Sequence, residues 1–92
     1  MITAIVLVHT AADRIPETAQ AIADLDGVSE VYSCAGDVDL IAVVKVAQHD
    51  QLADVIAGGL SKIDGVQRTD THIAFRSYSQ ADTEATFSVG LD

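Results

Sequence analysis

The sequence contains Leu25-Asp26-Gly27-Val28 and repeats it as Ile63-Asp64-Gly65-Val66, 38 positions further along the chain. Apolar residues at helical spacing precede each copy, and a run suited to a strand follows each copy. At the same offset, Val6 falls on Val44. A strand-helix-strand unit therefore occurs twice. This predicts an α+β, ferredoxin-like fold in βαββαβ order, with a four-stranded antiparallel sheet and two helices on one face.

Alternating aliphatic and β-branched residues predict the four strands, which we expect at Ile2–His9, Val28–Ala35, Leu40–Val46 and Gln67–Phe75. Two helices are expected between them. Pro16 suits the first turn of the first helix, and Asp26-Gly27 ends it. Asp50 is expected to cap the second helix, whose apolar stripe continues through Gly58-Gly59 until Gly65 ends it.

Two of the expected strands are apolar on both faces. Ile5 and Leu7 alternate with Val6 and Val8, and residues 40–46 show the same two-sided pattern. Two helices cover only one face of a sheet, and the other face of an antiparallel sheet is normally polar in a monomer. An apolar second face indicates an interaction surface. We therefore expect a homodimer packed sheet to sheet, of the dimeric α/β-barrel type.

The composition limits the class of protein. The chain has 92 residues, 49% of them apolar, and its five Lys and Arg against fourteen Asp and Glu give a net charge of −9. This length predicts one domain with a small core, and a single cysteine excludes an internal disulfide, so association is the remaining source of stability. The acidic balance argues against direct nucleic-acid binding. No apolar run reaches the ~20 residues of a membrane span and no signal segment opens the chain, so we expect a cytoplasmic protein that contacts no membrane.

Few residues suggest catalysis or metal binding. His9, His49 and His72 lack the close spacing of metal ligands, and a single cysteine rules out motifs with paired cysteines. Cys34 lies in an expected strand and is interpreted as a buried structural residue. We therefore expect no metal, no cofactor and no catalytic residue.

One turn carries the most suggestive polar chemistry. Gly36-Asp37-Val38-Asp39 separates two expected strands, and Thr69 and Thr71 lie in the last one. A glycine-containing turn can present backbone N–H groups to a carboxylate, aspartates can take an ammonium group, and the threonines offer hydroxyls. Together these groups suit the two charged ends of an amino acid. The same four residues are also ordinary turn chemistry, since aspartate bonds to its own nearby backbone.

The order of these residues resembles the effector domain of the Lrp/AsnC transcriptional regulators, also called the RAM domain. The resemblance covers Ile2 to Phe75. It rests on Val31-Tyr32-Ser33, Gly36-Asp37-Val38-Asp39, Leu40-Ile41, Leu52, Gly65-Val66, Thr69 and Thr71-His72-Ile73. Regulators of this family carry an N-terminal helix-turn-helix domain, whereas this sequence begins at the first effector-domain strand, so a stand-alone RAM-domain protein is expected. Val38 stands where the family often has an aromatic residue.

The resemblance implies an assembly as well as a fold. Two RAM domains pack sheet to sheet as a dimer, dimers assemble into rings that are often octamers, and small effectors, usually amino acids, bind in clefts between dimers. By position, the residues implied to line the cleft are Gly36, Asp37, Val38, Asp39, Thr69 and Thr71. We assign residues 1–77 to this ligand-binding domain and residues 78–92 to a C-terminal tail. In the tail, Ser79 is suited to cap a short helix that packs on a neighbouring subunit.

The function expected is that of a non-enzymatic amino-acid effector-binding and oligomerisation module. It would modulate the transcriptional regulation of amino-acid metabolism without binding DNA itself, and a full-length Lrp/AsnC-type regulator is a candidate partner. Two alternatives remain open: a small dimeric α/β-barrel enzyme of the monooxygenase or isomerase type, and a purely structural assembly domain. A deep pocket holding a buried acid or base pair would favour the enzyme.

Overall fold

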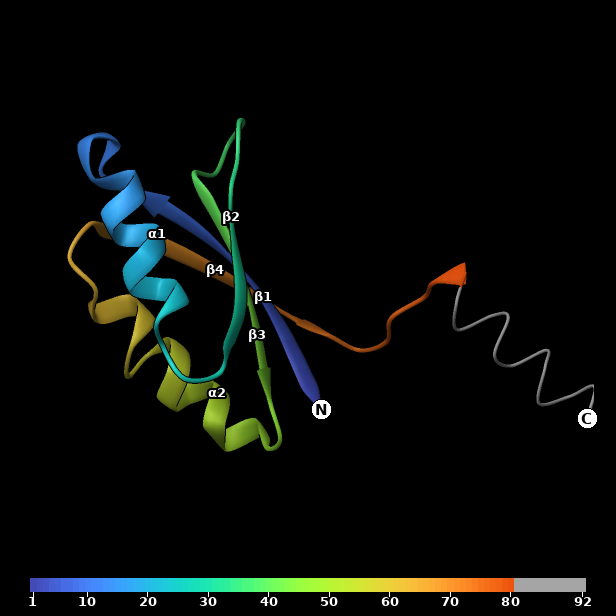
Figure 1. Cartoon of the computed structure of the whole chain (residues 1–92). Coiled ribbons are helices and arrows are strands. Elements are labelled where there is room, and N and C mark those ends of the chain that lie inside the picture. The colour runs from blue at the N-terminus through green and yellow to red at the C-terminus, as the bar shows by residue number, and fades with distance from the viewer. Residues whose placement is uncertain (81–92) are drawn as a thin grey trace, which may run out of the picture.

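Within the described residues, four antiparallel strands form one sheet in the order β2-β3-β1-β4. The structure is a computed structural model and describes residues 1–80. The elements are β1 (Ile2–Thr10), η1 (Ala12–Arg14), α1 (Ile15–Ala23), β2 (Val28–Ser33), β3 (Leu40–Val46), α2 (His49–Ile56), η2 (Leu60–Lys62) and β4 (Val66–Ala74). Both α-helices cover the same face of the sheet (Figure 1). This arrangement confirms the predicted ferredoxin-like βαββαβ fold.

The core lies between the helices and one face of the two central strands. Ala4, Val6 and Val8 of β1 are fully buried and alternate with residues of the other face. β3 alternates in the same way, and the antiparallel register pairs Val6 with Ala42 and Val8 with Leu40. The helical layer closes this face with Ile22, Leu52 and Leu60.

The repeated tetrapeptide builds the same turn twice. Gly27 has a φ of 96° and Gly65 a φ of 97°, in the left-handed region that glycine adopts without strain. In each copy the N–H of the following valine donates to the carbonyl three residues earlier, at 3.2 Å for Val28 and 3.1 Å for Val66. A Cβ on Gly65 would overlap with Oγ1 of Thr18, so this turn also packs tightly against α1. The helical segment before β2 and the helical segment before β4 therefore each enter their strand through a turn of the same conformation.

The second helix begins and ends earlier than the sequence predicts. Its N-cap is Gln48 rather than Asp50, because Oε1 of Gln51 accepts two backbone N–H groups, including that of Gln48 at 2.8 Å, and so anchors the first turn. α2 ends at Ile56, and Gly58-Gly59 lies in a turn before η2 rather than inside a helix. Each glycine costs about 1 kcal/mol against alanine in a helix interior, so the chain leaves the helix before the pair.

The observed β3 has the predicted bounds, Leu40–Val46, and the other three strands differ from their predicted ends by one or two residues. β2 stops at Ser33, before the predicted Ala35: the N–H of Cys34 still donates to the carbonyl of Asp39, but the N–H of Asp39 donates to Val8 of β1 instead of returning a bond to β2. The short helix expected after Ser79 falls on residues 81–92, which lie outside the described residues. No helix in residues 1–80 is long and apolar enough to cross a membrane.

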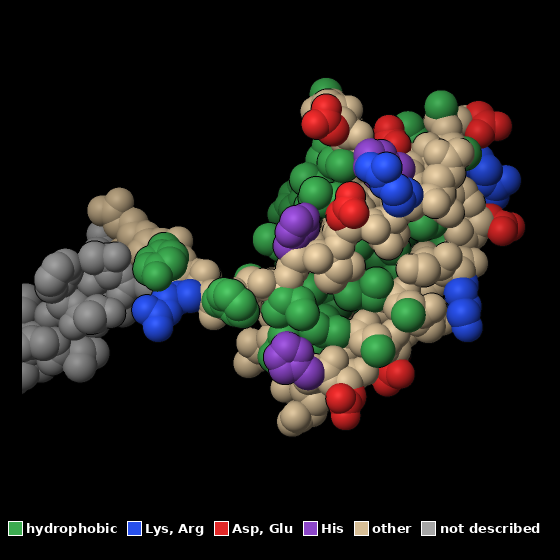
Figure 2. Space-filling view, turned by 180° about the vertical axis from the view of Figure 1, so that it is seen from behind, with side chains coloured by type: hydrophobic (Ala, Val, Ile, Leu, Met, Phe, Trp, Pro, Cys, Tyr) green, Lys and Arg blue, Asp and Glu red, His purple; other side chains and the backbone are tan. Residues whose placement is uncertain are grey.

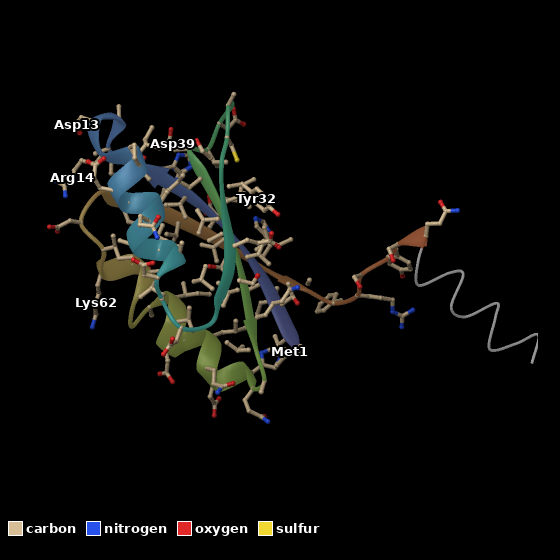
Figure 3. All side chains as sticks on the ribbon, viewed as in Figure 1. Met1, Asp13, Arg14, Tyr32, Asp39 and Lys62 are labelled. Atoms are coloured by element: carbon tan, nitrogen blue, oxygen red, sulfur yellow. The ribbon has the colours of Figure 1, made fainter. Side chains whose placement is uncertain are left out.

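The face of the sheet away from the helices is left uncovered by residues 1–80 (Figure 1). Ile5 is 38% exposed on this face and Leu7 is half-buried. Tyr32, at 51% exposed, points away from the helices (Figure 3). The two-sided apolar pattern of β1 and β3 is therefore present in the fold. We call this surface the open face; its residues include Ile5, Leu7, His9, Tyr32, Ile41, Val43, Arg68, Asp70 and His72.

Candidate functional site

The turn between β2 and β3, residues 34–39, lies at one end of the sheet. The N–H of Cys34 donates to the carbonyl of Asp39 at 2.9 Å, which closes the turn. The N–H of Asp39 donates to the carbonyl of Val8 at 3.0 Å, which ties the turn to β1. Four of the six candidate residues belong to this turn, so the structure brings Gly36, Asp37, Val38 and Asp39 together.

Asp39 is occupied by the fold. Its Oδ2 accepts the backbone N–H of Thr10 at 2.9 Å, in a partly buried environment. Asp39 lies at the end of the sheet opposite Met1 (Figure 3). A carboxylate that accepts a backbone N–H satisfies a group that the end of β1 would otherwise leave without a partner. Asp39 therefore acts first as a clamp between the turn and β1.

Asp37 and Gly36 present their groups to solvent. Both residues are exposed, and within residues 1–80 the carboxylate of Asp37 makes no hydrogen bond or ion pair. Gly36 has a φ of 137°, and a Cβ built on it would meet no heavy atom within 4 Å. Val38 beside them is half-buried. The turn thus offers one unpaired carboxylate next to backbone that a ligand can approach closely.

The structure separates the two threonines from this turn within one chain. β4 pairs with β1 and not with β3, and the register sets Thr69 opposite Val8 and Thr71 opposite Val6. Val8 also pairs with Leu40, at the end of the turn, so β1 lies between the turn and Thr69. Two strand spacings amount to about 10 Å. Thr69 is level with the turn and half-buried, whereas Thr71 lies further along the sheet and is exposed.

Thr10 is a polar residue at this end of the sheet that the sequence pattern does not reveal. It is 6% exposed, and its Oγ1 is buried without a hydrogen-bond partner within the described chain. An unsatisfied buried hydroxyl costs about 1–3 kcal/mol. A threonine at the end of a β-branched strand fits the pattern like any other strand residue, so burial alone distinguishes it.

A groove of about 600 Å³ lies at the opposite end of the sheet. Its apolar lining comes from separate parts of the chain, namely Met1, Leu25, Val46 and Val55. Figure 3 shows Met1 at this end, far from Asp39. No sequence motif marks the groove, because its lining residues are neighbours only in the folded chain. We call it the end groove.

Polar pairs border the apolar residues of the open face. Arg68 Nη2 lies 2.9 Å from Nε2 of His9, and it lies 3.9 Å from Oδ2 of Asp70. On β2, the hydroxyl of Tyr32 donates to the carboxylate of Glu30; this bond and the negative charge of Glu30 raise the pKa of Tyr32 above its ordinary value. The open face therefore has an apolar centre and a polar rim, which is the usual anatomy of a protein interface.

Residues 1–80 contain no group of three His, Cys, Asp or Glu side chains placed to hold a metal ion. Cys34 is half-buried rather than fully buried, and its thiol donates to the carbonyl of Tyr32 at 3.7 Å. Among the histidines, His9 and His72 lie on the open face and His49 begins α2.

Comparison with known proteins agrees with this architecture. The sequence matches the Lrp/AsnC ligand-binding domain over residues 3–83. It is 38% identical over 72 residues to the HTH-type transcriptional regulator LrpA1 of Halobacterium salinarum, a match that covers 78% of this chain and 49% of that protein. The chain thus spans about half the length of the curated relatives it matches.

Two solved structures place the fold in the same group. The protein TTHA0845 of Thermus thermophilus is 42% identical, with a TM-score of 0.81 over 87% of this chain and 100% of that one. The transcriptional regulator NMB0573 of Neisseria meningitidis, solved in complex with L-Met, is 15% identical, with a TM-score of 0.75 over 86% of this chain and 53% of that one. At that identity the second likeness concerns the fold alone. The family match spans most of the sequence, so this chain belongs to the Lrp/AsnC ligand-binding domain family, whose curated relatives are transcriptional regulators.

Proposed function

We propose that this domain binds a free amino acid at the turn of residues 34–39 and thereby acts as a non-enzymatic effector module. The observation that carries the proposal is the unpaired, exposed carboxylate of Asp37 beside the open backbone of Gly36. Membership of a ligand-binding family supports the same assignment. Asp37 would take the ammonium group of the ligand, and backbone N–H groups of the turn would take its carboxylate.

The site would be completed by a second copy of the chain. A fully exposed turn binds weakly because water screens its charges, whereas a cleft between subunits removes that water. Thr69 and Thr71 lie across β1 from the turn of their own chain, so their hydroxyls would reach a ligand there most directly from a neighbouring copy. Ligand binding and assembly would then be reciprocally linked.

The assembly would start from a homodimer through the open face and continue to a ring such as an octamer. Support comes from the apolar centre of the open face, including Ile5 and Leu7. The domain itself would not bind DNA, since a net charge of −9 repels phosphate. Control of transcription would instead pass through a regulator with its own DNA-binding domain.

Isothermal titration calorimetry with a panel of amino acids, L-methionine included, tests the ligand. Asp37→Asn should weaken binding by about 10- to 100-fold, the value of one hydrogen bond to a charged group. Asp13→Asn is the matched control, because Asp13 is an exposed acid in η1 that carries no part of the turn. It should leave the affinity unchanged.

Three results would contradict the assignment. Equal loss or equal retention of affinity in both variants would place the ligand elsewhere. A complete absence of binding across the panel, with the assembly intact, would favour a purely structural assembly domain. Chemical conversion of a bound small molecule, detected by mass spectrometry of the titrated mixture, would favour the dimeric α/β-barrel enzyme instead.

A further inference from the structure

The segment after β4 leaves the body of the molecule. β4 ends at Ala74, and residues 75–80 run outward on the side of the sheet away from the helices (Figure 1). Phe75 is fully exposed and Tyr78 is 83% exposed. The chain has only two phenylalanines, two tyrosines and no tryptophan, so half of its aromatic residues stand on this short segment. We call residues 75–80 the arm.

Two exposed aromatic side chains on so short a segment favour its burial against another surface. A buried aromatic side chain removes about 150–250 Å² from solvent, which makes aromatics the dominant anchors of interfaces. Arg76 lies between Phe75 and Tyr78, and within residues 1–80 its guanidinium makes no ion pair. Figure 2 shows hydrophobic and basic side chains on the arm, standing apart from the body. The arm thus pairs two apolar anchors with one unpaired cation.

The end groove has the complementary character. Its lining is mainly apolar, and its charged residues are Asp26, Asp54 and Lys45. The carboxylates of Asp26 and Asp54 suit the guanidinium of Arg76. The apolar anchors and the cation of the arm therefore match an apolar lining and two acids in the groove.

The arm and the groove also lie at the same end of the sheet. The register pairs Ala74, the last residue of β4, with Thr3, and pairs Ile2 with Val46, which lines the groove. The groove of the same chain is framed by the α2 side of the fold, through Val55, while the arm runs away from the helices (Figure 1). The arm therefore points away from the groove of its own chain and toward the space that a second copy packed against the open face would occupy.

We propose that the arm of one copy docks in the end groove of a second copy, with Phe75 and Tyr78 as apolar anchors and Arg76 facing Asp26 and Asp54. Six extended residues reach about 20 Å, which exceeds the ~10 Å between two sheets stacked face to face. The contact joins two different surfaces, so it forms twice in a twofold dimer or propagates between dimers. This contact is independent of any ligand at residues 34–39.

Cross-linking between two tagged copies tests the contact directly. In a Cys34→Ser background, one copy carries Ser77→Cys, which leaves both anchors of the arm in place, and a co-expressed, differently tagged copy carries Ala47→Cys in the groove. A short bifunctional maleimide should join the two tags in high yield. Asp13→Cys in place of Ala47→Cys is the matched control, since Asp13 lies at the other end of the fold (Figure 3) and should give a much lower yield.

Truncation of the anchor gives a second, independent measurement. Phe75 contacts little of its own chain, so Phe75→Ser should leave the far-ultraviolet circular dichroism spectrum unchanged. The same variant should raise the dissociation constant of self-association, measured by analytical ultracentrifugation, by at least tenfold. Arg76→Glu should weaken self-association as well, because it would place a carboxylate beside Asp26 and Asp54.

Several outcomes would overturn the proposal. These are equal cross-linking of Ala47→Cys and Asp13→Cys, unchanged self-association of Phe75→Ser, or a monomeric wild-type protein. An efficient cross-link inside one chain that carries both Ser77→Cys and Ala47→Cys, at a dilution where no second copy is bound, would also overturn it. That result would mean that the arm folds back onto its own groove. Except where the wild-type protein is monomeric, a sheet-to-sheet dimer could persist in each of these outcomes, so the cross-linking and Phe75→Ser tests do not depend on the open face.

Discussion

The carboxylate of Asp39 accepts the backbone N–H of Thr10 across 29 positions of sequence, at 2.9 Å. The same aspartate donates its own N–H to Val8 and accepts through its carbonyl from Cys34. Three contacts therefore hold Asp39, and the turn of residues 34–39 is fastened to the end of β1. This leaves the neighbouring Asp37 as the acid of the turn that is free to bind something else.

The two aspartates should therefore differ in their effect on stability. Asp39→Ala should lower the free energy of unfolding by about 1.5–3 kcal/mol, the value of a hydrogen bond to a charged group. Asp37→Ala should change it by less than about 0.5 kcal/mol, as is usual for an exposed residue without partners. Urea denaturation at one fixed protein concentration measures both. Equal destabilisation by the two variants would show that Asp39 is not the clamp.

Two buried threonines should respond oppositely to loss of their hydroxyl. Thr10→Val removes an Oγ1 that has no partner and should stabilise the fold by about 1 kcal/mol. Thr18→Val removes an Oγ1 that donates to the carbonyl of Asp64 at 3.4 Å, and should destabilise the fold by about 1 kcal/mol. Each change corresponds to roughly 4–8 °C in the thermal midpoint of a domain of this size. The pair is matched, because both side chains are buried and both gain a methyl group.

If Thr10→Val proves destabilising, its hydroxyl must have a partner in the assembled protein. Differential scanning calorimetry should be run at several protein concentrations, since a partner subunit makes the thermal midpoint depend on concentration.

Two glycines with left-handed backbone should differ in how they tolerate alanine. At Gly65 the new methyl group would overlap with Thr18 Oγ1, so strain and overpacking should together cost about 2–4 kcal/mol. At Gly36 the space is open, and only the backbone strain of about 1–2 kcal/mol applies. Chemical denaturation of the two variants measures the difference. A larger cost at Gly36 than at Gly65 would contradict the packing of the repeated turn.

An acid in the middle of the open face should break the proposed sheet-to-sheet dimer. Leu7→Asp would bury a carboxylate without a partner between two copies, and should raise the dissociation constant at least ~100-fold or prevent folding. Ser61→Asp is the control, because Ser61 is exposed in η2, outside the open face. Sedimentation velocity at micromolar concentration reports the assembly. An undisturbed assembly in Leu7→Asp would show that copies associate through another surface.

Much of the fold could be predicted from interactions between residues close together in the sequence. The alternation of Ile2–Thr10 assigns each side chain to one face because successive residues of a strand point in opposite directions. The repeated turn could be recognised in the sequence because glycine adopts the φ of Gly27 and Gly65 without the strain that other residues incur. The start of α2 was mispredicted although its cause is also local. The side chain of Gln51 accepts the backbone N–H of Gln48, and glutamine is a weaker sequence signal for a helix start than aspartate, the residue at position 50.

The sequence by itself determined which residues form strands, which faces they present and where the two equivalent turns lie, because these depend on neighbours along the chain. Only the tertiary structure decided how the polar candidates are used. It engaged Asp39 with Thr10 and left Asp37 free, and it set β1 between the turn and Thr69. It also assembled the end groove from residues far apart in sequence. These outcomes depend on hydrogen bonds and contacts between segments that are far apart in the sequence. Periodicity and spacing describe only neighbours along the chain, so they do not predict which distant group each side chain will contact.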